Sequence, residues 1–140
     1  MGKKRIAKTD GEEEKVVSKT ASSKKKIETG ILYVQSTYNN TMLNLTDMKG
    51  NSLAWSTSGA LGFKGAKKGT PFAAAKIGET LGLKAHTMGM REVAVIVKGV
   101  GSGREAAIRS FVAKGINIIS IKDMTPVPHN GPKPKKPRRV

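Results

Sequence analysis

The C-terminal tail carries the residues with the clearest chemistry. Thr125 to Val140 contains five of the chain's six prolines and five Lys or Arg residues, with no Asp or Glu. Proline fixes φ and lacks the backbone donor, so this segment is predicted to be extended rather than helical. Its cations are then spaced along a stiff thread that can neutralise a row of phosphates. They are Lys133, Lys135, Lys136, Arg138 and Arg139.

Two glycine-rich loops offer further contacts with phosphate. The stretch from Gly59 to Gly69 holds four glycines and three lysines, and glycine lets a ligand approach the backbone closely. Its cations are Lys64, Lys67 and Lys68. The second loop, Gly99 to Gly103, precedes Arg104 and a helical pattern, where free N–H groups suit a phosphate. It lacks the spacing of dinucleotide and Walker motifs, so its glycines serve either a nucleic-acid phosphate or only a tight turn.

Metal and acid–base catalysis have few residues to use. The chain has no cysteine and only two histidines, His86 and His129, so a metal site is not expected. A nuclease on a sheet needs carboxylates on its strands to hold divalent ions. The predicted strands contain none; they cover 31–36, 41–46, 53–58 and 93–97. We therefore expect no enzymatic activity, no metal and no cofactor.

The net charge points to a polyanionic partner. It is +16, far more than solubility requires, with +4 in residues 1–29, +7 in 30–125 and +5 in 126–140. Each phosphate contact needs its own cation, so a charge spread along the chain favours an extended nucleic acid over one small anion. Aromatic residues form only 4% of the chain, which disfavours a base-stacking surface. We expect Trp55 to be a core residue and Phe63 to anchor its loop to the core.

The elements that must position these cations begin with three strands. Two β-type runs, 31–36 and 41–46, flank Asn39 and Asn40, which tolerate the positive φ of tight hairpin turns. A second turn centred on Lys49 and Gly50 leads into a third run, 53–58. These patterns predict a three-stranded antiparallel unit.

Two helices and two apolar strands follow. Thr70 and Pro71 form a capped helix start, which predicts a helix over 70–84 with an apolar stripe that begins at Phe72. A second helix opens at Ser102 or Gly103 and stops at Gly115. The runs 93–97 and 116–121 are apolar on both faces, as expected of strands covered by helices. The order predicts a mixed sheet with helices packed on its faces.

Composition sets the domain boundaries. Residues 1–27 are predicted to be a flexible charged tail, because they contain too few apolar side chains to offset the cost of ordering. Residues 28–125 are expected to form one α/β domain, followed by the basic tail 126–140. No apolar run approaches the length of a membrane span, so no membrane partner is expected.

Several ordered motifs occur over about residues 28 to 140. They are Tyr38-Asn-Asn-Thr41, the stretch from Asp47 to Trp55, Gly62-Phe-Lys-Gly65, Thr70-Pro-Phe-Ala-Ala74, Val97-Lys-Gly99 with Gly103-Arg-Glu105, and Thr125-Pro-x-Pro-His-Asn-Gly131 closing on Arg138-Arg-Val140. Together these motifs resemble those of the small-subunit ribosomal protein S-eleven family, in its bacterial or organellar type.

The resemblance implies a ribonuclease-H-like three-layer α/β/α sandwich with a mixed five-stranded sheet and no nuclease activity. It also implies a structural constituent of the small ribosomal subunit that binds rRNA stem-loops on the platform, with its tail near messenger RNA at the exit and Shine-Dalgarno region. Neighbours implied are the proteins S-eighteen and S-seven, and S-twenty-one where the organism has it. The rRNA-facing set would be Asn39, Asn40, Lys64, Lys67, Lys68, Arg104, His129, Asn130, Lys133, Lys135, Lys136, Arg138 and Arg139.

A cytoplasmic ribosome is the expected location, with an organellar ribosome as the less favoured alternative. No small-molecule substrate is expected. The alternative function is that of a free RNA-binding regulatory protein, which would be recovered away from ribosomes.

Overall fold

The computed structural model describes residues 26–139 of the chain. The flexible tail predicted for residues 1–27 lies almost wholly outside the described residues. Of that segment only Lys26 and Ile27 are described, and both are in coil before the first strand.

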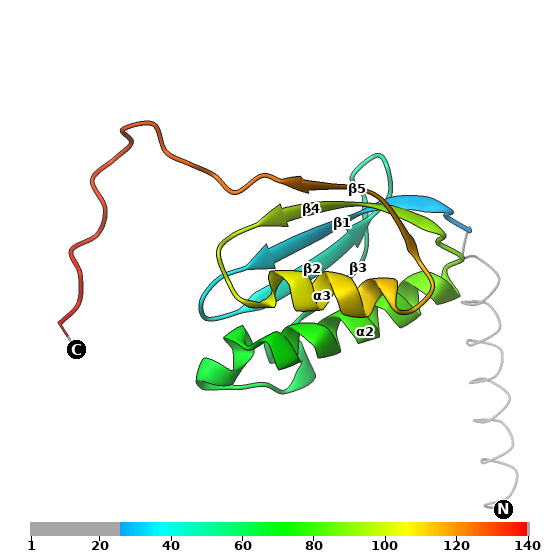
Figure 1. The fold of residues 1–140 in the computed structure, drawn as a ribbon, viewed down its shortest axis with the longest axis horizontal. Coiled ribbons are helices and arrows are strands. Elements are labelled where there is room, and N and C mark those ends of the chain that lie inside the picture. Colours follow the sequence, from blue (N-terminus) through cyan, green and yellow to red (C-terminus); the bar gives the residue numbers. More distant parts are fainter. Residues whose placement is uncertain (1–25, 140) are drawn as a thin grey trace, which may run out of the picture.

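A mixed five-stranded sheet forms the centre of the domain (Figure 1). Its strand order is β3-β2-β1-β4-β5. The first three strands are antiparallel neighbours, whereas β1 pairs with β4, and β4 with β5, in parallel. The strands are β1 (Thr29–Ser36), β2 (Thr41–Thr46), β3 (Ser52–Thr57), β4 (Glu92–Lys98) and β5 (Asn117–Asp123). The predicted α/β class and mixed sheet are confirmed.

Alternation along the central strands selects one face of the sheet for the core. Leu32 and Val34 on β1 are buried, and in β4 Val93, Val95 and Val97 are buried in the same way. Successive side chains of a strand point to opposite faces, so these residues all lie on the face that the helices cover. The intervening residues of β1 and β4 are only partly buried or exposed.

Two helices pack against each other along this face. They are α2 (Pro71–Thr87) and α3 (Gly103–Val112). A Cβ added at Gly78 would lie 2.9 Å from the Ser110 Cβ, and one at Gly82 would lie 2.8 Å from the Lys114 Cγ. The two glycines of α2, which lower its helix propensity, therefore permit the close approach of α3. Phe111 of α3 is fully buried between the helices and the sheet.

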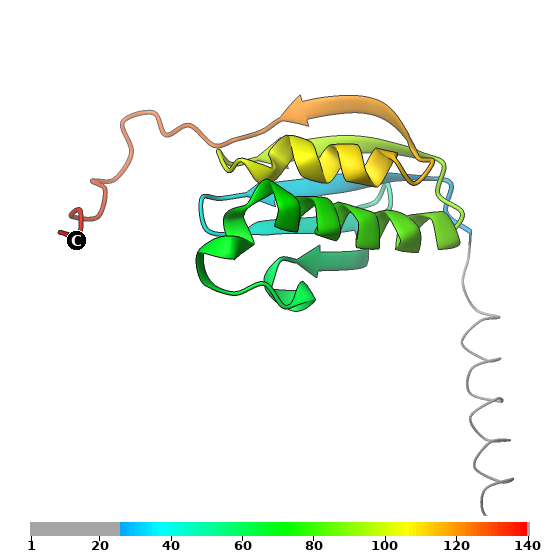
Figure 2. The ribbon, with the colours of Figure 1, turned by 60° about the horizontal axis from the view of Figure 1, so that its bottom comes forward.

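Both helices cover the same face of the sheet, so the described residues form two layers (Figures 1 and 2). The second helical layer of the expected three-layer sandwich is not present in residues 26–139. The cause lies in the topology: the crossovers from β3 to β4 and from β4 to β5 step in the same direction across the sheet. Parallel crossovers are right-handed, and two that run in one direction place their helices on one side.

Three further expectations about burial are wrong. Trp55 is 61% exposed rather than in the core, because β3 is an edge strand. Phe72 is 64% exposed at the start of α2, so the buried stripe of that helix begins at Ala73. Ile119 and Ile121 of β5 are exposed because this strand is the other edge of the sheet; Ile121 faces α3, but a hollow that it lines with Ile108 separates the two elements.

Candidate nucleic-acid interface

The loops with candidate residues lie at one end of the sheet (Figure 1). Strands β1, β3, β4 and β5 run in the same direction, so their carboxyl ends meet at one edge. The hairpin 37–40, the loop 58–70, the loop 99–102 and the C-terminal tail all leave from this edge. Both helices also begin here, which adds two positive dipole ends. We call this end of the domain the glycine–lysine end.

The hairpin between β1 and β2 carries Asn39 and Asn40. The Thr37 N–H donates to the Asn40 carbonyl at 2.8 Å, and the Asn40 N–H donates to the Thr37 Oγ1 at 3.1 Å. The sequence predicts that these asparagines adopt the positive φ of a tight turn, but among the described non-glycine residues only Asn130 has a positive φ. Hydrogen bonds with Thr37 therefore close the turn, without a positive φ at either asparagine. The Asn40 Oδ1 is buried without a hydrogen-bond partner in the described part of the chain.

Glycines let three of these loops pack backbone against backbone. A Cβ at Gly69 would overlap the Tyr38 carbonyl, and one at Gly99 or Gly101 would overlap Ser36. The Gly101 N–H donates to the Ser36 carbonyl at 2.9 Å. The tight-turn interpretation of the second glycine loop therefore has direct support, since packing inside the domain accounts for its glycines.

Hydrogen bonds to its backbone hold the loop from Gly59 to Gly69 in place. Within it are two short 3-10 helices, η1 (Gly59–Leu61) and η2 (Gly65–Gly69), so the segment predicted as an irregular loop is partly ordered. The Ser58 Oγ donates to the Lys68 carbonyl at 2.7 Å. The Thr70 Oγ1 accepts from the Ala73 N–H at 3.4 Å, as the predicted helix cap requires.

The side chains of this loop keep their charges free. Lys64 and Lys67 are exposed and Lys68 is half-buried. The ion pairs among residues 26–139 join Lys76 to Glu79, Arg104 to Asp123 and Arg109 to Glu105, so none neutralises the three loop lysines. Fixed backbone with unpaired ammonium groups is an arrangement that can accept phosphates.

Phe63 anchors the loop to α2 rather than to the core. Its ring meets the Phe72 ring edge to face, with 6.1 Å between centroids. The Lys76 Nζ also lies over the Phe72 ring, 5.5 Å from its centroid. Because Phe72 is itself largely exposed, this contact is at the surface.

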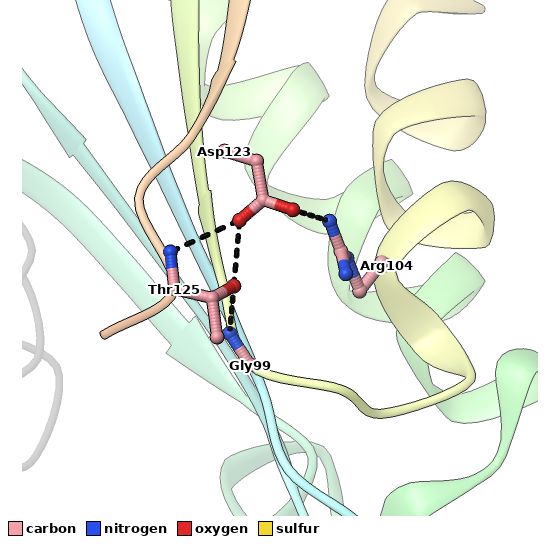
Figure 3. A network of polar contacts seen from close by, with 4 residues as sticks. All are labelled: Gly99, Arg104, Asp123 and Thr125. Carbon is pink, nitrogen blue, oxygen red and sulfur yellow. Dashed lines mark hydrogen bonds and ion pairs between the residues drawn. The ribbon is translucent and has the colours of Figure 1, made fainter. Parts of the chain in front are cut away.

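Arg104 is not a free cation. Its guanidinium donates to the Asp123 carboxylate at 2.7 Å, as Figure 3 shows. The Thr125 Oγ1 donates to the same carboxylate at 2.6 Å and accepts from the Gly99 N–H at 3.2 Å. These bonds, chiefly those from Thr125 and then that from Arg104, lower the pKa of Asp123 to about 2. We call this group of four residues the tail latch, because it fixes the point where the tail leaves β5.

Beyond the tail latch, residues 126–139 are exposed or nearly so and contain no helix or strand. This agrees with the extended tail that the prolines predict. His129 and Asn130 lie in a bend where Asn130 adopts a φ of 53°, the left-handed region that asparagine tolerates. The tail cations Lys133, Lys135, Lys136, Arg138 and Arg139 are exposed. They are not brought against the domain.

Lys98 belongs to this end and was missed by the sequence reasoning. It is exposed at the last position of β4 and lines a hollow of about 590 Å³ with Tyr38, Val100 and Pro126. The sequence contains a signal for this position, because a lysine that ends an apolar strand directly before a glycine loop must lie beside that loop.

The arrangement of these side chains is suited to a polyanion. In the part of the chain that the structure describes, no group of three His, Cys, Asp or Glu side chains could hold a metal ion. No described helix is long and apolar enough to cross a membrane. Free cations, close-packed backbone and a basic tail together define a polyanion-binding α/β domain.

Comparison with known proteins identifies the family. The model of the family described as ribosomal protein S11 matches residues 30–139. The protein named small ribosomal subunit protein uS11 in two strains of Treponema pallidum, one of them the Nichols strain, is 51% identical over 124 residues. The match covers 89% of this chain and 98% of each relative. The chain belongs to the ribosomal protein S11 family.

Proposed function

We propose that this protein is a structural constituent of the small ribosomal subunit that binds small-subunit rRNA through the glycine–lysine end and the C-terminal tail. The proposal rests on the convergence of several cationic segments at one end of the sheet. Loops that are far apart in the sequence bring Lys64, Lys67, Lys68 and Lys98 to one end of the sheet, and the tail leaves from the same end. Family membership supports the ribosomal assignment.

Binding in this proposal relies on charge neutralisation and shape. Each ammonium or guanidinium that meets a phosphate releases condensed counterions, which is a sequence-independent gain. The hairpin residues Asn39 and Asn40 and the bend residues His129 and Asn130 add hydrogen-bonding groups beside these cations. Arg104 contributes in a different way: it holds Asp123 and so orients the start of the tail.

The finer assignment extends the resemblance to particular contacts. The rRNA sites would be stem-loops of the platform, and the tail would reach toward the exit and Shine-Dalgarno region of messenger RNA. Protein neighbours would be S-eighteen and S-seven, with S-twenty-one where it exists. Each of these is a proposal that rests on the family resemblance.

We further propose that the protein has no nuclease activity. The chain belongs to a family of ribosomal proteins, and the carboxylates on the described strands lie only at strand ends, in Glu92 and Asp123. Asp123 already accepts bonds from Arg104 and Thr125. RNA incubated with the purified chain should stay intact after addition of magnesium or manganese; cleavage would contradict this proposal.

Sedimentation tests the main proposal. In a sucrose gradient at low salt, the tagged chain should co-sediment with small subunits, and its fraction there should fall as salt is raised. Recovery only in light fractions bound to other RNA would instead support a free regulatory protein. Recovery as an unbound monomer at low salt would contradict both functions.

A further inference from the structure

Strand β3 is an edge strand without the usual protection. It lies at the end of the sheet and pairs only with β2. Its residues, Ser52–Thr57, include no charged side chain and no proline. Exposed edges present unpaired N–H and C=O groups, and single-chain proteins usually protect them with charges or proline. An unprotected edge therefore indicates a surface that is covered in the working assembly.

The other edge of the same sheet gives a contrast. Strand β5 ends in Lys122 and Asp123, and the cationic tail follows directly. These charges protect β5 from added strands. The absence of such charges in β3 is thus a property of one edge, not of the chain as a whole.

An apolar groove runs beside β3. It lies between β3, η1 and α2, has a volume of about 720 Å³, and contains Lys84 as its only charged lining residue. Its larger apolar lining residues are Leu53, Trp55, Leu61, Leu83 and Met88. Trp55 is 61% exposed and Leu83 is 57% exposed, although both are large apolar side chains. Exposed apolar side chains gathered around an unpaired sheet edge mark an interaction site.

We propose that the β3 groove takes up an extended segment of a neighbouring protein as a sixth strand of the sheet. The added backbone would pair with the free edge of β3, and every second side chain would enter the apolar groove. Lys84 favours an acidic residue in that segment. The inference rests on the proposed function, because a small-subunit component has protein neighbours that can supply the segment.

Charge argues against the two other occupants. An RNA strand needs a cation for each phosphate it brings, and the groove offers only Lys84. A second copy of this chain would bring another net charge of +16 to the same edge, which opposes pairing. A neutral or acidic polypeptide meets neither difficulty.

A photocrosslinking residue tests the occupant directly. p-Benzoylphenylalanine is placed at Leu83 of the full chain, which is assembled into small subunits, irradiated and examined by mass spectrometry. The control carries the same residue at Ile119 on β5, which is 58% exposed at the opposite edge. We expect a crosslink from position 83 to one segment of another small-subunit protein, and no such product from position 119. Crosslinks only to rRNA or to a second copy, or none above the control, would overturn the proposal.

Hydrogen exchange tests strand addition itself. Amides in 52–57 should exchange at least about 10-fold more slowly in assembled subunits than in the free chain, because pairing protects them. Leu83→Glu should remove that protection, whereas Ile119→Glu should keep it. Thermal unfolding of each free variant checks that the fold is intact, and Leu83→Gln replaces the glutamate if it is not. Equal exchange in free and assembled wild-type chain would overturn strand addition.

Binding of the free chain to small-subunit rRNA separates this inference from the proposed function. Leu83→Glu should bind the rRNA within about 2-fold of wild type, since the groove is remote from the tail and carries one cation. A large loss of rRNA affinity would show that the groove is an RNA surface, which would overturn the inference and leave the proposed function standing. A wild-type chain that fails to enter small subunits would overturn both.

Discussion

The two ends of the sheet are built from the same strands, yet they use charge in opposite ways. At the end opposite the glycine–lysine end, Asp47 closes the turn between β2 and β3. Its carboxylate accepts bonds from the Lys49 N–H at 2.9 Å, from the Asn51 N–H at 2.9 Å and from the Asn51 side chain at 3.0 Å. These bonds lower the pKa of Asp47. The turn is self-contained, and its charge is used within the turn itself.

At the glycine–lysine end, Thr37 closes the hairpin locally, but the loops also hold one another. The hairpin packs on Gly69, the loop after β4 packs on Ser36, and Ser102 donates to the Gly69 carbonyl at 3.2 Å. Backbone groups therefore hold the loops together, and the ammonium groups of the lysines are left unpaired. Close backbone packing between the loops thus leaves the lysine side chains of this end free to meet a ligand.

Removal of the tail should give the largest effect. Deletion of residues 132–140 takes away all five tail cations, so the slope of log K against log salt for rRNA binding should flatten by about 3 to 4. Filter binding of small-subunit rRNA at several salt concentrations measures the slope. An unchanged slope would mean that the tail cations do not meet phosphates.

The packing of the glycine–lysine end can be broken with one methyl group. Gly101→Ala should lower the free energy of unfolding by about 3 kcal/mol, because the new Cβ overlaps the Ser36 side chain and the Thr37 carbonyl. Gly50→Ala at the opposite end is the matched control. It has a φ of +95° but open space around it, so it should cost only about 1 kcal/mol. Urea unfolding measures both, and equal costs would contradict the packing explanation.

The loop lysines sharpen the comparison between the two ends. Lys67→Ala combined with Lys68→Ala should flatten the salt slope for rRNA binding by about 1.5, because two phosphate contacts are lost. Lys49→Ala combined with Arg91→Ala removes the same charge from the opposite end and should leave the slope unchanged. If the two double variants behave alike, the cations act only through the total charge of the domain.

The smallest effect concerns the tail latch and its pH dependence. The pKa of Asp123 is lowered to about 2 in the folded chain, so its contribution to stability is present above about pH 4 and is lost as the pH falls toward 2. Asp123→Asn should therefore be less stable than wild type at pH 7, and the difference should shrink as the pH approaches 2. Urea midpoints across this range measure it; a constant difference would show that the carboxylate charge is not involved.

Local sequence signals predicted the parts of the fold that depend on near neighbours. The Thr70 cap, the proline at the start of α2 and the turn at Gly50 formed as expected. Gly115 has the predicted left-handed φ of 91°, although α3 already ends at Val112. Each depends on backbone preferences within a few residues, which the sequence shows directly. The tail cations of the candidate site were predicted in the same way, because proline and charge are properties of the segment itself.

Features set by strand order could not be found from sequence. Trp55 alternates as a core residue would, but β3 is an edge, and periodicity does not reveal which strand is last. The same uncertainty made 116–121 look like a covered strand. Arg104 and Asp123 lie 19 residues apart, so only the parallel pairing of β4 with β5 brings them together. The number of layers depended on two crossover directions, which no local pattern encodes.

If the glycine–lysine end and the tail both bind rRNA, as proposed, the tail latch makes the protein a bivalent ligand. Because Thr125 is bonded to both Gly99 and Asp123, the tail is a tether with a fixed origin beside the loop lysines. Extended at about 3.1 Å per residue, it can reach roughly 40 Å from that origin. Once the domain has docked, the tail samples phosphates within this radius at a high effective concentration, so the second contact is intramolecular. Two modest electrostatic contacts then give avidity, and either one can dissociate and rebind while the other keeps the protein in place.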